Sequence, residues 1–339
     1  MSKTTDLLDE IFQLRLKARV DSRTTACSVQ TVHEKKDAVL VQGFLHYAQL
    51  DAFVKTTAKE VYAGYEITFK LRVLERRNGG KFAVVTDAAA DIWRKPGPTD
   101  NDNRDNQALY GTIVRVYFKE GDFTYVQHPD GYVGYVPTRH LRAATAEDYL
   151  DWKNGAHVVT LVPVKHGDIT IPMGARLRYR DGKALDVDGA PVTMSTKQRR
   201  IFDVTKSKFL DEAVRLAESL MDTPYLWGGK SEVGIDCSGF MQTLAIQQGI
   251  VLPRDASMQC HVGEIVGYLP DMADLLPGDI IFFMNKNGYV FHVGMYLGDH
   301  IYMHSAGATG PIKSSVYKNG KNFMKRYDNS YVYARRVFR

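Results

Sequence analysis

The sequence predicts an α+β protein built from several modules, and three observations support this. At 339 residues the chain exceeds the length of a single hydrophobic core, which usually stops near ~200 residues. Its apolar spacing changes from helical to alternating near Lys81 and becomes helical again near Ser207. The apolar share of 44% and the aromatic share of 11% are typical of a folded globular protein. We therefore expect four consecutive modules, at residues 1–80, 81–142, 143–205 and 206–339.

Residues 1–80 have the pattern of a small α/β domain. Helical spacing runs through residues 5–20 and 47–62, and strand patterns run through residues 37–44 and 66–74. No cluster of acids, bases or nucleophiles falls within these segments. The sequence therefore assigns no role to this domain.

Residues 81–142 have the short alternating runs of a small antiparallel barrel. Strands are expected at residues 111–118, 123–127 and 130–136, with turns at their Gly and Asp residues. The last strand, Asp130-Gly-Tyr-Val-Gly-Tyr, resembles a bacterial SH3-type domain, with Tyr135 where such domains more often have Trp. Residues 143–205 hold further short strands and are expected to form a second, degenerate SH3-like domain.

Charge and cysteine content favour no special partner. The formal charge of +5 is spread thinly along the chain, so we expect neither a nucleic-acid nor a membrane partner, and the sequence leaves the oligomeric state open. Cys27, Cys237 and Cys260 are too few and too widely spaced for a disulfide framework, which suits a reducing compartment. The sequence as given has no apolar signal segment, so a cytoplasmic location is expected; a removed export signal would instead make the protein secreted or envelope-associated.

Cys237 is the strongest candidate for a chemical role. It follows Asp236, a good N-cap residue, and precedes an apolar stripe that reaches towards Gly249. This pattern predicts that Cys237 opens a helix, where unpaired N–H groups and the helix dipole favour a thiolate. The sequence therefore predicts a nucleophilic cysteine.

His292 and His304 are candidates for a base and the group that orients it. They lie in two strand patterns on either side of Gly298 and Asp299, which predict a β-hairpin. With a three-residue loop, Leu297–Asp299, the two histidines are directly opposed at ~5 Å. A two-residue loop, Gly298-Asp299, would place them on opposite faces. We predict the three-residue loop.

A zinc site is the alternative for the same residues. Cys237, His292 and His304 are suitable zinc ligands, and three of them would leave an open coordination position. Inhibition by a thiol alkylator but not by a chelator would favour the nucleophile.

Six motifs follow one another in the last module, namely Tyr225-Leu-Trp-Gly-Gly, Gly234-Ile-Asp-Cys-Ser-Gly-Phe, Leu252-Pro-Arg-Asp-Ala-Ser-Met-Gln, Leu276-Pro-Gly-Asp-Ile-Ile-Phe-Phe, His292-Val-Gly-Met-Tyr-Leu-Gly and Met303-His-Ser-Ala-Gly. Together they resemble the NlpC-type cysteine peptidases, over roughly residues 207–339. The resemblance implies a papain-like fold, in which a helix bearing Cys237 packs on an antiparallel sheet bearing His292 and His304. It implies neither a metal nor any other cofactor.

SH3-type domains before the catalytic domain resemble the subgroup that cleaves γ-D-glutamyl–diamino acid bonds in peptidoglycan stem peptides with a free N-terminal L-Ala. This resemblance implies that Tyr132 and Asp255 close the cleft and meet the substrate ammonium. Two blander roles remain open, because Tyr132 suits a barrel core and Asp255 suits a helix cap. The remaining residues expected to bind substrate are Tyr225, Trp227 and Ser238.

Two other functions remain open from the sequence. Related papain-like domains act as N-acetylmuramoyl-L-alanine amidases or as endopeptidases on intact peptidoglycan. The SH3-type modules are also suited to a non-catalytic protein that binds wall peptides.

Overall fold

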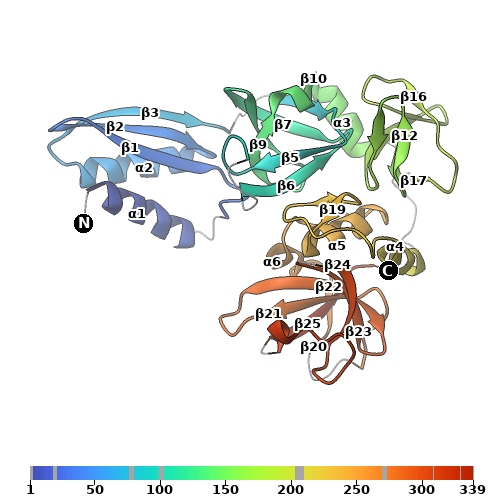
Figure 1. The fold of residues 1–339 in the computed structure, drawn as a ribbon. Helices are drawn as coiled ribbons and strands as arrows, with labels where there is room; N and C mark the ends of the chain where they lie inside the picture. The colour runs from blue at the N-terminus through green and yellow to red at the C-terminus, as the bar shows by residue number, and fades with distance from the viewer. Residues whose placement is uncertain are drawn as a thin grey trace. The chain divides into compact units, whose positions relative to one another are not determined.

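The protein is described here by a computed structural model covering residues 3–17, 21–75, 80–98, 103–202, 210–268, 273–307, 309–328 and 330–338. The chain divides into two compact units. The first holds residues 1–80 with Gly131–Val133, and the second holds residues 81–130 and 134–339. Helices and antiparallel sheets alternate along the chain (Figure 1), which confirms the predicted α+β class.

The first unit is a three-stranded sheet with two helices. β1 and β2 are antiparallel and β3 lies parallel to β2, joined to it through α2. Apolar residues from the helices and from β2 form its core, with Leu7, Val39 and Val54 almost completely buried. The sequence did not predict β1. The elements are α1 (Lys3–Lys17), β1 (Cys27–Lys35), β2 (Ala38–Leu45), α2 (Ala48–Val61) and β3 (Glu66–Val73).

The SH3-type domain contributes a seven-stranded sheet to the second unit, in the order β10-β4-β7-β8-β9-β5-β6. Small and β-branched side chains such as Val85, Ala90 and Val126 fill its core. β8 has the bounds that the alternating pattern predicted. The strands are β4 (Lys81–Val85), β5 (Ala89–Trp93), β6 (Arg104–Leu109), β7 (Ile113–Glu120), β8 (Phe123–Gln127), β9 (Val133–Pro137) and β10 (Leu141–Ala144).

A smaller module follows, with a five-stranded sheet in the order β16-β15-β14-β11-β17 and the separate pair β12-β13. Its helix begins with a capping box in which Thr145 and Asp148 satisfy each other's backbone N–H groups. The elements are α3 (Ala146–Asn154), β11 (His157–Thr160), β12 (Val164–His166), β13 (Ile169–Ile171), β14 (Arg176–Arg180), β15 (Lys183–Leu185), β16 (Pro191–Val192) and β17 (Arg199–Phe202).

The last module packs α5 and α6 on a six-stranded sheet, in the order β20-β25-β21-β22-β23-β24, and α4 packs on α5 (Figure 1). This is the predicted papain-like arrangement. α5, which begins with Cys237, packs on β22 and β23. The elements are α4 (Leu210–Ser219), β18 (Lys230–Ser231), β19 (Gly234–Ile235), α5 (Cys237–Ile246), α6 (Ala256–Gln259), β20 (Glu264–Tyr268), β21 (Ile280–Met284), β22 (Val290–Gly298), β23 (Ile301–Ala306), β24 (Gly310–Ser315), η3 (Lys325–Tyr327) and β25 (Tyr331–Arg336).

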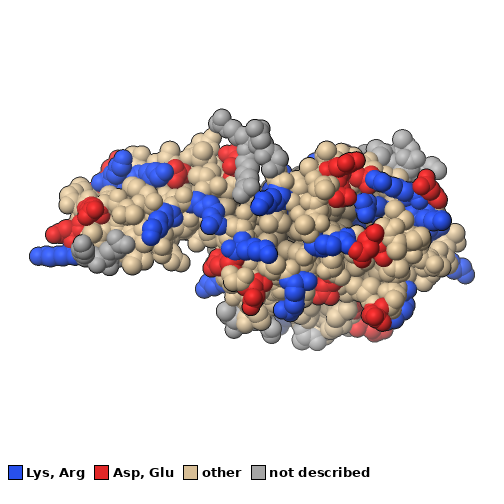
Figure 2. Space-filling model, turned by 90° about the horizontal axis from the view of Figure 1, so that it is seen from above, with Lys and Arg blue, Asp and Glu red and all other residues tan. Residues whose placement is uncertain are grey.

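The surface carries mixed charge. Figure 2 shows acidic and basic side chains interspersed over the displayed face, so the charge of +5 is not gathered there into a patch of one sign. Within the described ranges, none of the helices has the length and apolarity needed to cross a bilayer.

Candidate active site

Cys237 is the first residue of α5, as the sequence predicted. Asp236 precedes it with extended backbone (φ −93°) and accepts a hydrogen bond of 2.7 Å from the N–H of Gly239, so its carboxylate caps the helix. The Asp236 carboxylate also accepts from the N–H of Gly228 at 2.8 Å. One buried side chain therefore fixes both the helix start and the loop before it.

Gly239 serves this packing rather than the approach of a substrate. A Cβ on Gly239 would lie 2.1 Å from the carbonyl oxygen of Gly229, closer than any real contact. The loop backbone itself occupies the space that the missing side chain leaves.

His292 on β22 and His304 on β23 contact each other directly. Nε2 of His292 lies 2.7 Å from Nδ1 of His304, and the rings meet edge to face at 85°. Nε2 of His304 in turn lies 3.0 Å from the hydroxyl of Ser314 on β24. The imidazoles are thus linked in a row that ends at Ser314, which the sequence did not single out.

The predicted register of the hairpin is wrong, although the two histidines do share a face. Gly298 pairs with Ile301, so the turn is the two residues Asp299 and His300, both at positive φ (50° and 61°). A bulge at Leu297 then shifts the register by one residue. A two-residue turn alone would have placed His292 and His304 on opposite faces of the sheet. The bulge returns them to the same face.

His304 consequently lies opposite Gly294 rather than opposite His292. Met295 pairs with Met303, and a Cβ on Gly294 would lie 3.0 Å from Cβ of His304. The bare glycine leaves room for the two imidazoles to meet along the diagonal of the sheet. Gly294 therefore has a structural purpose that its place in the motif did not reveal.

Aromatic rings hold both imidazoles. Tyr327 of η3 stacks on His292, with ring centroids 4.6 Å apart and planes at 17°. Tyr302 stacks on His304 at 4.5 Å and 27°, and Phe283 packs against His292 at 5.5 Å. These contacts limit rotation of the rings and exclude water from them.

Cys237 lies beside this histidine pair. α5 packs on β22, and the backbone N–H groups of Ser238 and Val293 are within hydrogen-bond reach of the Cys237 sulfur. Val293 directly follows His292 in the chain, which places the sulfur at the strand that carries the imidazole. The structure thus places the Cys237 sulfur at the strand that carries His292, and the joint catalytic role of Cys237, His292 and His304 stays a prediction.

The ionisation of the thiol differs from the sequence expectation. Burial, followed by the charge of Asp236, raises the pKa of Cys237 to about 12, against the helix-terminus effect. Burial also lowers the pKa of His292 well below its usual value and that of His304 to about 3. These shifts favour the uncharged forms of the thiol and of both imidazoles.

A buried ion pair supports the start of α5. Arg254 donates from both terminal guanidinium nitrogens to the two carboxylate oxygens of Asp236, with side chains only 1% and 6% exposed. It also donates to the hydroxyl of Ser238 at 2.8 Å. Bidentate Arg–carboxylate pairs are strong and geometrically specific. The hydroxyl of Ser238 is engaged inside the protein, so we reassign Ser238 from substrate contact to support of the helix.

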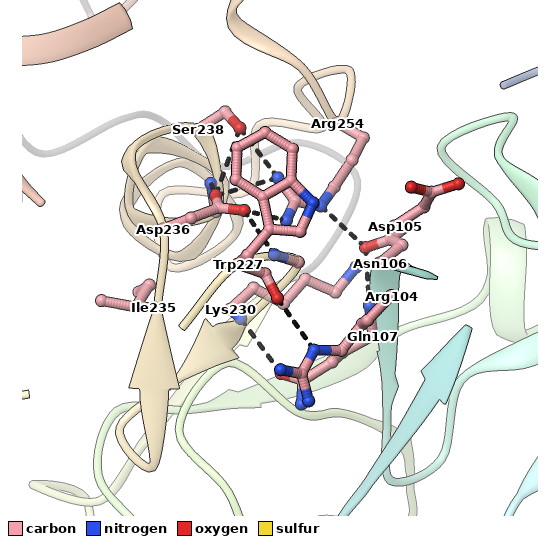
Figure 3. A network of polar contacts seen from close by, with 12 residues as sticks. Arg104, Asp105, Asn106, Gln107, Trp227, Lys230, Ile235, Asp236, Ser238 and Arg254 are labelled. Atoms are coloured by element: carbon pink, nitrogen blue, oxygen red, sulfur yellow. Dashed lines mark hydrogen bonds and ion pairs between the residues drawn. The ribbon is translucent and has the colours of Figure 1, made fainter. Parts of the chain in front are cut away.

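This support continues into the SH3-type domain (Figure 3). Nε of Arg254 donates to Oδ1 of Asn106 at 3.0 Å. Nδ2 of Asn106 donates to the Asp130 carboxylate at 2.9 Å. Asn106, on β6, thus joins the charged groups of the two domains. Residues 148 positions apart in the chain make the Asn106–Arg254 contact, and no local pattern could have predicted it.

The loop before α5 is held by the same strand of the SH3-type domain. Nε of Arg104 donates to the carbonyl of Trp227 at 2.8 Å, and the N–H of Lys230 donates to the side chain of Gln107 at 3.1 Å (Figure 3). The Tyr225–Gly229 motif is therefore positioned by another domain.

Lys230 belongs to a buried charged cluster behind α5. Its amine lies 3.7 Å from the Asp130 carboxylate and 3.3 Å from Nε2 of His128. Burial lowers the pKa of Lys230 to about 8, although Asp130 opposes the shift. Burial opposes ionisation of Asp130, but the charges of His128 and Lys230 outweigh it and lower the Asp130 pKa. Asp130 is therefore ionised at neutral pH.

The remaining predicted substrate residues fall into two groups. Trp227 is 50% exposed, and Tyr225 is half-buried and forms a β-bridge with Ile235 two residues before Cys237. Burial, then the Cys237 and Asp236 charges, raise the pKa of Tyr225, so its hydroxyl stays protonated. Asp255 stands at the N-cap of α6, but its side chain makes no cap hydrogen bond, which disagrees with the helix-cap alternative.

Tyr132 is the predicted residue that the structure does not place at the site. It is 1% exposed and lies in Gly131–Val133, a segment of the first unit. Its part in substrate binding stays a sequence prediction.

The zinc alternative does not suit this geometry. The nitrogens of His292 and His304 that face each other are joined by a hydrogen bond, not directed towards a common metal position. Across the described ranges, no three His, Cys, Asp or Glu side chains are arranged to hold a metal ion.

Known proteins share this architecture. Residues 222–332 match the NlpC/P60 family, and residues 96–141 match the bacterial dipeptidyl-peptidase SH3 domain. The gamma-D-glutamyl-L-lysine dipeptidyl-peptidase of Bacillus cereus is 28% identical over 240 residues, 62% of this chain and 69% of its own length. The corresponding protein of Bacillus subtilis is 27% identical over 214 residues, 59% of this chain and 71% of its own length.

A solved structure agrees with the fold. The crystal structure of an NlpC/P60 family protein from Bacillus cereus matches with a TM-score of 0.64 at 23% identity, covering 76% of this chain and 100% of that one. A helix with Cys237 on a sheet with two histidines defines a papain-like domain. The chain carries an NlpC/P60 domain, of a family of cysteine peptidases, preceded by a bacterial SH3 domain.

Proposed function

We propose that the protein is a cysteine peptidase that hydrolyses the γ-D-glutamyl–diamino acid bond of peptidoglycan stem peptides with a free N-terminal L-Ala. The observation that carries the proposal is the contact of His292 with His304, on the strand beside the Cys237 sulfur. It gives a nucleophile, a base and a group that orients the base.

Proton positions follow from the row of imidazoles. Nε2 of His292 is engaged by His304, so Nδ1 of His292 is the nitrogen left to accept the thiol proton. Nε2 of His292 must then carry its hydrogen and donate to Nδ1 of His304. His304 in turn carries its hydrogen on Nε2 and donates to the hydroxyl of Ser314.

In acylation, the proton of Cys237 moves first to His292 and then to the leaving amine. Nδ1 of His292 takes the proton of Cys237 while the sulfur bonds to the γ-carbonyl carbon of D-Glu. The backbone N–H of Cys237, at the start of α5, is a donor for the resulting oxyanion. The imidazolium of His292 passes its proton to the leaving amine as the C–N bond breaks, which leaves an acyl-enzyme.

Deacylation uses the same groups in reverse. Water gives a proton to His292 as its oxygen bonds to the acyl carbon, and the thioester bond breaks. The sulfur of Cys237 recovers the proton from His292, and L-Ala-D-Glu is released. The protein supplies every proton transfer in this cycle.

Substrate preference rests on the relatives and on the residues around the cleft. Two similar proteins bear the name gamma-D-glutamyl-L-lysine dipeptidyl-peptidase. Asp255 offers a half-buried carboxylate for the substrate ammonium, and the exposed indole of Trp227 offers an apolar wall. Tyr132 and Tyr225 are the proposed phenols of the site.

The central test is product release from L-Ala-γ-D-Glu-L-Lys by the full chain. Cys237→Ala should abolish release of L-Ala-D-Glu without changing the circular dichroism spectrum or the melting temperature. Retained turnover in this variant would refute Cys237 as nucleophile.

A second substrate separates the proposal from its alternatives. Mass spectrometry of products from the free tripeptide and from its N-acetylmuramoyl form should show cleavage of the first alone. Release of the intact tripeptide from the muramoyl form would instead identify an amidase, and cleavage of intact sacculi would identify a wall endopeptidase. Binding without cleavage of any of them would identify a non-catalytic protein.

Activity should persist in mildly acidic solution. His292 must be neutral to accept the thiol proton, and burial lowers its pKa well below 6.5. The acid limb of kcat/KM should therefore be centred below pH 6.5 when the tripeptide is assayed across pH 4 to 8. An acid limb centred at or above pH 6.5 would contradict a buried neutral base.

A further inference from the structure

An exposed arginine stands next to the histidine pair. Arg326 lies in η3 (Lys325–Tyr327), the short helix that carries the ring stacked on His292. Among the residues that the structure describes, no carboxylate forms an ion pair with Arg326. A guanidinium at the edge of a site for acidic peptides is thus open to a ligand.

Geometry connects Arg326 to the proposed base. Its guanidinium lies 4.8 Å from the ring centroid of Tyr327, and the Tyr327 ring stacks on His292 at 4.6 Å. The ring of Tyr327 therefore contacts both Arg326 and His292. The Arg326 charge adds to burial in lowering the pKa of His292 and of His304, and it also acts on Tyr225 beside Cys237.

The position of the leaving group indicates which part of a substrate lies near Arg326. His292 protonates the leaving amine, so the leaving residue must lie over His292 during acylation. In a stem tripeptide that residue is the diamino acid, and its α-carboxylate is attached to the carbon that bears the amine. A cation beside His292 can therefore meet this carboxylate.

We propose that Arg326 is a specificity-determining residue that binds a carboxylate of the leaving diamino acid. This inference rests on the proposed function and adds a preference for stem peptides that end at that residue. Arginine suits the task because its planar fork of donors matches a carboxylate. Stacking on Tyr327 holds the fork in place before substrate arrives.

A structural role for Arg326 predicts something different. Packing on Tyr327 alone would support the His292 ring equally for every substrate. A carboxylate-binding role acts only on substrates that carry the carboxylate. Comparing an acid with its amide therefore separates the two.

The experiment measures kcat/KM of the full chain on L-Ala-γ-D-Glu-L-Lys and on the same tripeptide with a C-terminal amide. Arg326→Gln should lose roughly 10- to 100-fold on the acid, the range for a hydrogen bond to a charged group, and little on the amide. Arg326→Lys should recover part of the loss, because it keeps the charge but not the fork. Lys325→Gln, the adjacent exposed cation, should leave both substrates unchanged.

The two carboxylates of meso-diaminopimelate are distinguished by a second pair of peptides. If Arg326 binds the α-carboxylate, the acid-to-amide difference at that position is the same for Lys and diaminopimelate peptides. If it binds the carboxylate at the far end of the side chain, Arg326→Gln affects the diaminopimelate peptides alone.

Equal losses on the acid and the amide of the Lys tripeptide, no loss on any substrate, or the same loss in Lys325→Gln would overturn the inference while leaving the peptidase intact. A wild-type protein that cuts none of these peptides would refute the proposed function, and this inference with it.

Discussion

The NlpC/P60 domain meets two neighbours in the second unit, and the two junctions differ in kind. Towards the SH3-type domain, the buried charges of Arg254, Asp236, Lys230 and Asp130 are tied together through Asn106. Towards residues 143–202, Glu232 accepts from the N–H of Met173 at 3.0 Å, and Arg200 donates to the carbonyl of Gln247 at 3.1 Å.

A cavity of about 440 Å³ lies where the three modules adjoin. Apolar side chains of all three line it, among them Leu109, Trp152 and Ile246. A space of this size forgoes the close packing of a protein interior. The SH3-type domain thus takes part in the buried charged network that supports Cys237. Residues 143–202 form a looser junction with the NlpC/P60 domain.

This difference indicates that the SH3-type domain helps to hold the residues that support Cys237. Removing one partner of a buried charged network leaves the others uncompensated, whereas a single hydrogen bond at a looser junction is worth little. Four substitutions test this contrast.

Arg254→Met should have the largest effect. It leaves the Asp236 carboxylate buried without its cation, so the free energy of unfolding should fall by about 3–5 kcal/mol, with a matching fall in kcat. Urea unfolding monitored by Trp fluorescence measures the first. Lys313→Met breaks an exposed ion pair with Glu218 in the same domain and should cost about 1 kcal/mol or less. Similar losses in the two variants would contradict the special weight of the buried pair.

Asn106→Leu should come next, with about 1–3 kcal/mol lost, because Arg254 and Asp130 each lose a hydrogen-bond partner. kcat should fall as well, since the helix start under Cys237 is no longer held from the SH3-type domain. Asn103→Leu is the matched control, because Asn103 is also buried and its side chain bonds to the backbone of Lys95 and Gly97. It should lose stability and keep kcat. Equal kcat in both variants would count against the coupling.

The Lys230 cluster should make stability depend on alkaline pH. The pKa of Lys230 is about 8 in the folded protein, below its ordinary value of 10.5, so above pH 8 the unfolded chain binds more protons. Stability should therefore rise with pH, by about 1 kcal/mol between pH 7 and pH 9. Lys230→Met should remove this rise in urea titrations at the two pH values. A wild-type stability that declines over the range would disprove the assignment.

Glu232→Gln should have the smallest effect. The amide oxygen still accepts from the N–H of Met173, so we expect a change of about 0.5 kcal/mol and no change in kcat. A large loss of activity here would show that the looser junction also supports the site.

Local patterns in the sequence predicted much of this molecule. The bounds of β8, the helix start at Cys237 and the cap by Asp236 follow from alternation and capping, which act over a few residues. The shared face of His292 and His304 was also correct.

The errors came from effects that no local pattern contains. The bulge at Leu297 is a single inserted residue that shifts the register of the hairpin, and no local pattern predicts it. Burial raises the pKa of the Cys237 thiol against the effect of the helix dipole, and burial is known only from the fold. Ser314 and Tyr327 lie in elements that the sequence analysis did not predict, so their contacts with the histidines could not be foreseen.

The bond between Asn106 and Arg254 also has a consequence for synthesis. During translation, the SH3-type domain leaves the ribosome well before Arg254 does, and domains generally fold as they emerge. Asn106 and Asp130 are then already in place when Arg254 emerges. The later domain therefore folds in contact with an earlier one. A fragment that starts at residue 206 lacks that template, and we expect it to form the sheet more readily than a properly ordered start of α5.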